Sequence, residues 1–600
     1  MPYGMMGKIL FINLSTQEIN EEFIEEKAYK EFLGGYGIGA RVLYSRQKPG
    51  VEPLGPENIL GFVSGLLTGT PVPTGARFAV VAKSPLTGGW GDANSGGDFG
   101  PYLKFAGFDG IFIQGISSYP IYLLIDNGKG YIREAGYIWG KDTYETEEIL
   151  KDLYGKQSRV ACIGPSGEKL SLIAGILTEH GSMAARSGLG AVMGSKKLKA
   201  VVVRGDTEVK IADKESLMKL RTDQIKAWQT PMPSGQSMMQ EMHQYGTSAG
   251  VYDSAYSGDS PIKNWGGVGV IDLPDREGLH RDVFASRVEK RIGCWHCPIA
   301  CKGLLKAGEG EFEYSVGCHR PEYETAAAFG ALCANSNTES IMKANDICNR
   351  AGLDTISAGT AIAFAIELYE NGILTKDDTS NIDLKWGNYY SIVKMTEKLV
   401  SREGLGDILA DGVKIAAGKI GKGSEKFAVH IGGQELGFHD PKLSTPWNQM
   451  AAARYQMDAT PGRHTARFGP QDFGTHVVSA AGLCMFGGFA MNEKTAKIFN
   501  AVTAWEYSVA DLCKVGERIA NIRHAFNLRE GINELNWAVH PRIVGKPPQM
   551  VGPLAGVTAD LKAQVYWCLG AMDWDRVTTK PSKPKLLSLG LDDVAQDLWT

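Results

Sequence analysis

Hydrophobic and polar positions divide the chain into two parts with different periods. Up to about residue 207, short apolar or β-branched runs are bounded by Gly, Pro and Asn, which is the pattern of β-strands and turns. The predicted strands cover residues 9–14, 78–82, 110–115, 121–125 and 198–204. From about residue 208, apolar residues recur at helical spacing instead. The predicted helices cover residues 214–228, 322–335, 340–351, 360–371, 390–402 and 404–418.

This change of period predicts an α+β protein of several domains. A chain of 600 residues exceeds the ~250–300 residues that one hydrophobic core usually serves. Polar segments near residues 211–215 and 421–426 mark joints. We therefore expect a β-rich domain of residues 1–207, followed by two mainly helical domains of residues 208–425 and 426–600.

Glycine is unusually frequent, with 74 residues in 600, and much of it lies in the first third. Three glycine-rich segments, residues 34–39, 88–100 and 187–194, separate the predicted strands. They do not match the dinucleotide-binding fingerprint, because they are not each placed between a strand and a helix with an acidic residue some twenty positions later. Turn chemistry explains any one of them. Together they favour a backbone-lined cradle for a phosphate-bearing ligand.

Charge and hydropathy exclude several classes of function. The formal net charge is −4, with 63 basic and 67 acidic side chains interspersed, so no basic stripe for nucleic acid or polybasic membrane patch is present. The N-terminus passes directly into a strand-like run, and no run of some twenty apolar residues occurs. Ten scattered cysteines suit a reducing compartment. We expect a cytoplasmic protein without a membrane span.

Cys294, Cys297 and Cys301 are the only close cluster of cysteines. Thiols at this spacing converge on an iron–sulfur cluster or on a zinc ion. Both need a fourth ligand, and His296 inside the motif offers one for zinc. The spacing differs from the Cys-x-x-x-Cys-x-x-Cys order of radical enzymes. A cluster with a distant fourth cysteine is the leading interpretation, with zinc as the alternative.

The sequence resembles the tungsten-containing aldehyde ferredoxin oxidoreductase family over nearly its whole length. The resemblance rests on the glycine-rich β domain, the cysteine motif, residues 321–325 (Pro-Glu-Tyr-Glu-Thr), residues 352–354 (Gly-Leu-Asp) and residues 482–484 (Gly-Leu-Cys). It implies that the two sheets of the β domain form a base for a bis-molybdopterin tungsten cofactor (tungstopterin). It also implies a [4Fe-4S] cluster and a Mg²⁺ ion joining the pterin phosphates.

The same resemblance assigns residues to these groups. The cluster ligands would be Cys294, Cys297, Cys301 and Cys484. Arg77 would bridge cluster and pterin, Asn94 and the Ala184 carbonyl would serve Mg²⁺, and Leu353, Asp354 and Leu483 would contact the pterins. Taken alone, Asp354 is predicted to cap a helix at residue 355. Asn349 and Ser479 depart from the family pattern, which has an acidic residue at both positions.

Catalysis is assigned by the resemblance to a glutamate and a histidine. Glu324 and His464 are chosen, with Glu322 as a second possible glutamate and His439 as a second possible histidine. An aldehyde carbonyl needs a hydrogen-bond donor at its oxygen and a carboxylate that takes a proton. Without the resemblance, Glu324 would be a solvated helix residue and His464 a core histidine. Cys318 and Cys333 are predicted core residues, although a soft metal contact stays open.

The resemblance implies an enzyme that oxidises aldehydes to carboxylic acids and passes electrons to ferredoxin or a small iron–sulfur subunit, as an oligomer or within a larger complex. The residues do not distinguish tungsten from molybdenum. The alternative is the tungsten subunit of a benzoyl-CoA reductase, which reduces an aromatic ring. A third interpretation, from a different class, is a protein that binds a zinc ion or cluster for structure or electron relay alone; it would make the other matches coincidental.

Overall fold

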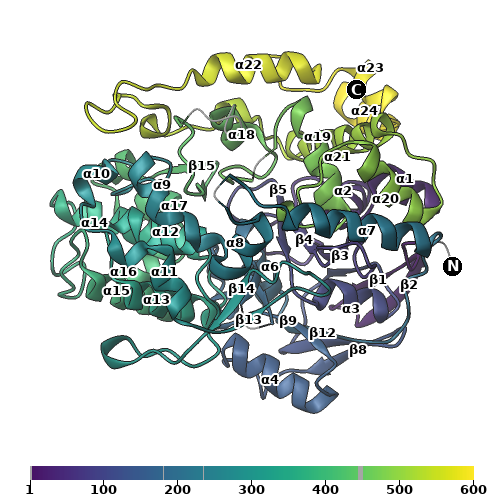
Figure 1. The fold of residues 1–600 in the computed structure, drawn as a ribbon, viewed down its shortest axis with the longest axis horizontal. Helices are drawn as coiled ribbons and strands as arrows, with labels where there is room; N and C mark the ends of the chain where they lie inside the picture. The colour runs from purple at the N-terminus through teal and green to yellow at the C-terminus, as the bar shows by residue number, and fades with distance from the viewer. Residues whose placement is uncertain (1–2, 180, 234, 444–449, 466) are drawn as a thin grey trace.

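The computed structural model describes residues 3–179, 181–233, 235–443, 450–465 and 467–600. Its N-terminal part holds two six-stranded sheets (Figure 1). The first sheet has the order β2 (Glu18–Phe23), β1 (Lys8–Asn13), β6 (Gly110–Gln114), β3 (Leu60–Ser64), β4 (Phe78–Lys83), β5 (Trp90–Ser95). The second has the order β11 (Ser182–Ala184), β10 (Ile176–Thr178), β9 (Arg159–Cys162), β12 (Leu198–Arg204), β7 (Ile121–Asp126), β8 (Lys129–Glu134).

The two sheets share one core, and the period of two along each strand explains how. In β12, Val201 and Val203 belong to the core that also holds Phe62 of the first sheet. The alternate residues Ala200 and Val202 pack instead with Leu150, on helix α4 (Thr143–Tyr154). Both faces of β12 are therefore apolar, as expected for a strand covered on both sides.

Helices cover the outer face of the first sheet. Helix α2 (Gly35–Arg46) and helix α21 (Val509–Arg529), from opposite ends of the sequence, join this face in a single core through Val81, Leu43 and Ile522. Figure 1 shows most of the C-terminal helices, in green and yellow, on this side of the molecule, whereas α22 (Leu561–Met572) lies beside α18 (Ala451–Met457). The bounds of the others are α19 (Phe473–Ala480), α20 (Glu493–Thr503), α23 (Lys583–Ser588) and α24 (Asp592–Trp599).

The middle of the chain forms a separate helical core beside the sheets (Figure 1). Its central helix, α14, has buried residues on all sides, including Ala358, Phe364 and Leu368. The helices of this part are α9 (Val251–Ser257), α12 (Tyr323–Phe329), α13 (Thr338–Ala351), α14 (Thr355–Glu370), α15 (Tyr389–Ser401), α16 (Leu405–Leu409) and α17 (Val413–Ile420). Helix α7 (Lys214–Gln229) connects this part to the sheets. Among the described helices, none is long and apolar enough to cross a membrane.

The predicted fold class is confirmed, since two sheets precede two mainly helical parts. All five predicted strands are present. The prediction was wrong at residues 34–39, which begin α2 rather than form a loop. A Cβ atom at Gly39 would lie 2.9 Å from Val81, so close packing of the helix on β4 outweighs the low helix propensity of glycine.

Two predicted helices are shorter than expected. The helix predicted over residues 322–335 ends at Phe329 and gives way to a 3-10 turn over Ala331–Cys333. The helix predicted over residues 404–418 is two helices, α16 and α17. Gly412 between them has φ of +84°, a conformation that interrupts a helix and that glycine adopts without strain.

Candidate functional site

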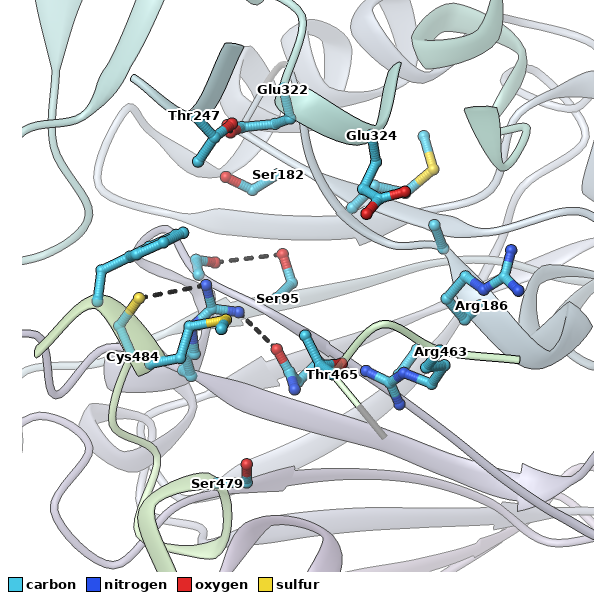
Figure 2. A pocket seen from close by; sticks show the side chains of 18 of the residues that line it. Ser95, Ser182, Arg186, Thr247, Glu322, Glu324, Arg463, Thr465, Ser479 and Cys484 are labelled. Atoms are coloured by element: carbon cyan, nitrogen blue, oxygen red, sulfur yellow. Dashed lines mark hydrogen bonds between the residues drawn. The ribbon is translucent and has the colours of Figure 1, made fainter. Parts of the chain in front are cut away.

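A cavity of about 500 Å³ lies where the sheets and both helical parts meet. Asn94 of β5, Glu324 of α12 and Leu483 after α19 all line it. Figure 2 shows Glu322 and Glu324 on one side, with Cys484 and Arg463 across the cavity. Segments far apart in the sequence therefore supply one site.

The four predicted cluster cysteines line this cavity. Cys294, Cys297 and Cys301 lie in the loop between β13 (Val288–Ile292) and β14 (Lys302–Leu305), and Cys484 follows α19. Burial raises the pKa of Cys297 to about 11 and that of Cys301 further. Within the described ranges, no three His, Cys, Asp or Glu side chains are grouped to hold a single metal ion. A [4Fe-4S] cluster takes one thiolate per iron, so its ligands stand further apart than those of one ion.

Arg77 contacts both Cys484 and β5. Its Nη2 atom lies 3.4 Å from Cys484 Sγ, and its Nη1 atom donates to Asn94 Oδ1 at 2.5 Å. The Cys484 and Cys294 side chains raise the pKa of Arg77 against the opposing effect of burial. This cation is directed at the thiols rather than at a surface carboxylate.

The segment before Cys484 is locked onto the first sheet. The Cys484 amide donates to the Thr74 carbonyl at 3.2 Å, and the Arg77 amide donates to the Gly482 carbonyl at 3.0 Å. A Cβ atom at Gly65 would lie 2.1 Å from the Gly482 nitrogen, and Gly482 itself has φ of +78°. Two glycines are thus needed for the backbone to approach this closely.

Asp354 caps helix α14, as its sequence context predicted. Its Oδ1 atom accepts from the Ile356 amide at 3.0 Å, and its Oδ2 atom pairs with Arg186 Nη1 at 2.7 Å. Asp354 and Arg186 both line the cavity. Leu353 and Ala184 are fully buried next to lining residues and do not line it themselves, so any contact with a ligand there would use their backbone.

Glu324 and His464 form a pair that opens into the cavity. Nδ1 of His464 lies 2.9 Å from Glu324 Oε1, and the Phe438 amide donates to Oε2 at 2.9 Å. Burial alone would raise the pKa of Glu324, but His464, His439 and this amide lower it to about 2. Glu322 also lines the cavity, yet Thr247 Oγ1 donates to its carboxylate and no histidine is paired with it among the described residues.

His439, Cys318 and Cys333 differ in their position relative to the cavity. His439 lines it, with Nε2 3.8 Å from Glu324 Oε1. Cys318 and Cys333 are fully buried and lie away from the cavity, in agreement with their prediction as core residues. Asn349 and Ser479, which depart from the family pattern, both line it.

A buried charged group that no sequence motif indicated lines the site. Asp92 of β5 pairs with Arg463 Nη1 at 2.7 Å and with Arg523 Nη2 at 2.8 Å. Arg523 also reaches Asp458 at 3.0 Å. Arg463 belongs to the same segment as His464, but nothing in the spacing indicated its partner, which is 371 residues away.

The cavity wall suits a large polar ligand. Several lining side chains carry a buried polar atom with no hydrogen-bond partner among the described residues: Thr74 Oγ1, Arg186 Nε, His319 Nε2 and Arg523 Nε. Buried polar groups are rarely left unpaired. Nδ1 of His319 donates to the Arg320 carbonyl at 2.7 Å, and burial lowers the pKa of His319 to about 4, so its unpaired Nε2 atom is an acceptor. Donors, acceptors, arginines and four thiols around one cavity fit a phosphate-bearing organic cofactor beside an iron–sulfur cluster.

A two-sheet base, two helical parts and four thiols around one cavity define a cofactor-binding redox protein. Two family models match: "Aldehyde ferredoxin oxidoreductase, N-terminal domain" over residues 9–205, and "Aldehyde ferredoxin oxidoreductase, domains 2 & 3" over residues 224–591. The chain belongs to the aldehyde ferredoxin oxidoreductase family. It is therefore an enzyme of this tungsten family, and membership implies a tungsten–pterin and an iron–sulfur cofactor.

Known relatives cover the chain from end to end. The tungsten-containing aldehyde ferredoxin oxidoreductase of Pyrococcus horikoshii is 35% identical over 98% of this chain and 100% of its own length. The aliphatic sulfonate oxidoreductase, WOR-like subunit, of Pyrococcus furiosus is 30% identical over 99% and 98%. Among solved structures, the active site complex BamBC of benzoyl coenzyme A reductase with 1,5-dienoyl-CoA matches with a TM-score of 0.84 and 26% identity, covering 100% of this chain and 99% of that one.

Proposed function

We propose that this enzyme oxidises aldehydes to carboxylic acids at a bis-pterin tungsten centre and passes the electrons through a [4Fe-4S] cluster to ferredoxin or an iron–sulfur partner subunit. The observation that carries the proposal is the Glu324–His464 pair, which opens into the cavity lined by all four cysteines. The residues proposed for proton transfer and those proposed to hold the electron-transferring cluster then line the same cavity. The 35% identity to an aldehyde ferredoxin oxidoreductase supports this reaction over others of the family.

The chain offers residues for each part of the cofactor. Cys294, Cys297, Cys301 and Cys484 would hold the cluster, and Arg77 would lie between cluster and pterin. Asn94 and the Ala184 carbonyl would serve Mg²⁺ at the phosphates, because Mg²⁺ prefers oxygen ligands. Leu353, Asp354 and Leu483 would contact the pterins. The tungsten–pterin would supply two-electron redox chemistry at this site, and the cluster held by the four cysteines would supply one-electron transfer.

Oxidation of an aldehyde consumes one water and yields the acid, two electrons and two protons. The protein must bind the carbonyl, exclude bulk water and accept protons. Glu324 is the proposed acceptor because it faces the cavity, is ionised and is already oriented by the Phe438 amide. Its pairing with Nδ1 of His464 leaves the other ring nitrogen of His464 to orient the carbonyl oxygen. General acid–base groups of this kind contribute roughly 10²–10⁴-fold to a rate.

Single substitutions of Glu324 and His464 test the proposal. In Glu324→Gln and His464→Asn, we expect kcat for aldehyde oxidation to fall by about 10²-fold or more, with tungsten and iron contents unchanged. His280→Asn is a matched control, because His280 lies by α11 (Arg281–Ser286) with 37% of its side chain exposed. Glu322→Gln separates the two glutamates. Wild-type turnover in Glu324→Gln with full metal content would remove Glu324 from the mechanism.

Reduction of an aromatic thioester is the second candidate, and the similarity to the BamBC structure favours it. The BamBC structure is named a complex, and the WOR-like protein is named a subunit. We propose that this chain also works with a partner subunit. Benzoyl-CoA with a strong reductant distinguishes the reactions. Ring reduction without aldehyde oxidation would replace the main proposal by this one.

A further inference from the structure

Asp259 is a carboxylate that no sequence motif singled out, and it holds His439. It follows α9 and Gly258, and its Oδ2 atom lies 2.8 Å from His439 Nδ1. Ser254 Oγ donates to the same oxygen at 3.3 Å. The Asp440 amide donates to the Asp259 carbonyl at 2.7 Å. Because a carboxylate only accepts, the Nδ1 atom of His439 carries the shared proton.

The ring of His439 is fixed in its plane as well. It stacks on Tyr323 with ring centroids 4.5 Å apart and planes 11° from parallel. Tyr455 donates to the His439 carbonyl at 2.9 Å. With Nδ1 held by Asp259, Nε2 is left on the cavity side, 3.8 Å from Glu324 Oε1. The buried Glu324 oxygen is therefore flanked by two imidazoles, His464 and His439.

His439 is placed between the cavity and another region of the protein. It lines the cavity, whereas Asp259 does not, although 17% of the Asp259 side chain is exposed. Asp259 is therefore joined to the cavity through His439. Protons released in a closed site need a route of this kind, since the two electrons leave through the cluster and not with them.

We propose that Asp259 and His439 form a proton relay that carries protons from Glu324 out of the cavity, with Asp259 as the positioning residue of His439. The inference rests on the proposed function, which releases two protons per aldehyde. In the relay, Glu324 and His439 approach from 3.8 Å to hydrogen-bond distance, and the O–H bond of protonated Glu324 breaks as an N–H bond forms at His439 Nε2. The proton on Nδ1 then passes to Asp259 and to solvent, and no electrons move in either step.

The surrounding charges agree with this role. The titratable groups that face His439 are Asp259, Glu324, His464, Tyr323 and Tyr455. Burial alone would lower the pKa of His439, but the hydrogen bond to Asp259 and the charge of Glu324 raise it above its usual value. The raised pKa makes neutral His439 a stronger proton acceptor than a free histidine. Loss of Asp259 should move this pKa down.

Chemical modification of the holoenzyme tests the relay without relying on turnover. Diethyl pyrocarbonate reacts with neutral imidazole, and 36% of the His439 side chain is exposed. The rate of modification at His439, located by mass spectrometry, therefore gives its titration midpoint. We expect this midpoint to lie at lower pH in Asp259→Asn than in the wild type. Asp253→Asn, a substitution of an exposed residue on α9, should leave the His439 midpoint unchanged.

Steady-state kinetics provide the second measurement. In Asp259→Asn, we expect kcat to fall about tenfold or more, KM for the aldehyde to stay unchanged, and the acidic limb of the pH profile to move to lower pH. Asp259→Glu should restore part of the rate. A fall in kcat without movement of the His439 midpoint would overturn the relay. If the wild type oxidises no aldehyde, the proposed function fails, and the midpoint alone then decides whether Asp259 holds His439.

Discussion

At the scale of single residues, Cys484 is the proposed ligand on which the cluster assignment depends most. It lies far after the other three cysteines in the sequence but lines the same cavity. Cys484→Ala should reduce the iron content and abolish the cluster's visible absorption, with the thermal transition little changed, because its half-buried thiol adds little to the core. Cys513→Ala, at a half-buried cysteine on α21, is the control. An undiminished iron content in Cys484→Ala would contradict the assignment.

Residues that line the cavity could be predicted where a motif or a family pattern marks them. The spacing of Cys294, Cys297 and Cys301 indicated an inorganic centre, and a family pattern supplied Cys484 and Glu324. Asp259 could not be predicted, because an aspartate after a short helix is a common turn residue. Its role arises only when the fold brings it 2.8 Å from His439. Arg523 was missed for the same reason, since its partners Asp92 and Asp458 are set by tertiary packing.

At the scale of elements, the contact between residues 65–68 and residues 481–484 positions one wall of the site. Gly65→Ala would place a Cβ atom 2.1 Å from the Gly482 nitrogen, where only backbone movement can relieve the clash. We expect a loss of about 1–3 kcal/mol in unfolding free energy, together with a lower iron content, measured by denaturation and metal analysis.

Gly418→Ala is the matched control for this exchange. Gly418 lies in helix α17, and an added Cβ there meets nothing within 4 Å. Alanine should therefore stabilise the protein by about 0.5–1 kcal/mol. Equal unfolding free energies for Gly65→Ala and the wild type would show that the backbone contact does not need glycine.

Element prediction succeeded where local pattern and tertiary environment agree. The five strands follow from β-branched apolar runs, and α13 and α15 follow from helical spacing. Glycine caused two opposite errors in the prediction. Residues 34–39 were predicted as a loop but lie at the start of a helix, because Gly39 packs on Val81. Residues 404–418 were predicted as one helix, but Gly412 divides it in two. The sequence shows that glycine is present, but not whether a close contact or a turn requires it.

At the scale of the whole molecule, the site exists only because three parts of the chain meet. The Asp92 carboxylate of the first sheet pairs with Arg463 and Arg523 from the C-terminal part, and the cysteine loop joins from the middle part. Removal of one partner from a buried ion pair typically costs ~3–5 kcal/mol. The arrangement therefore ties the stability of the parts to the geometry of the cavity.

The most direct test of the central claim is an anaerobic assay of the purified protein with its metals counted. A panel of aldehydes is offered with a viologen dye as acceptor, and benzoyl-CoA with a strong reductant is offered in parallel. We expect dye reduction by aldehydes, with about one tungsten and four irons per chain. The same metals without aldehyde oxidation, or a protein that binds no pterin, would contradict it.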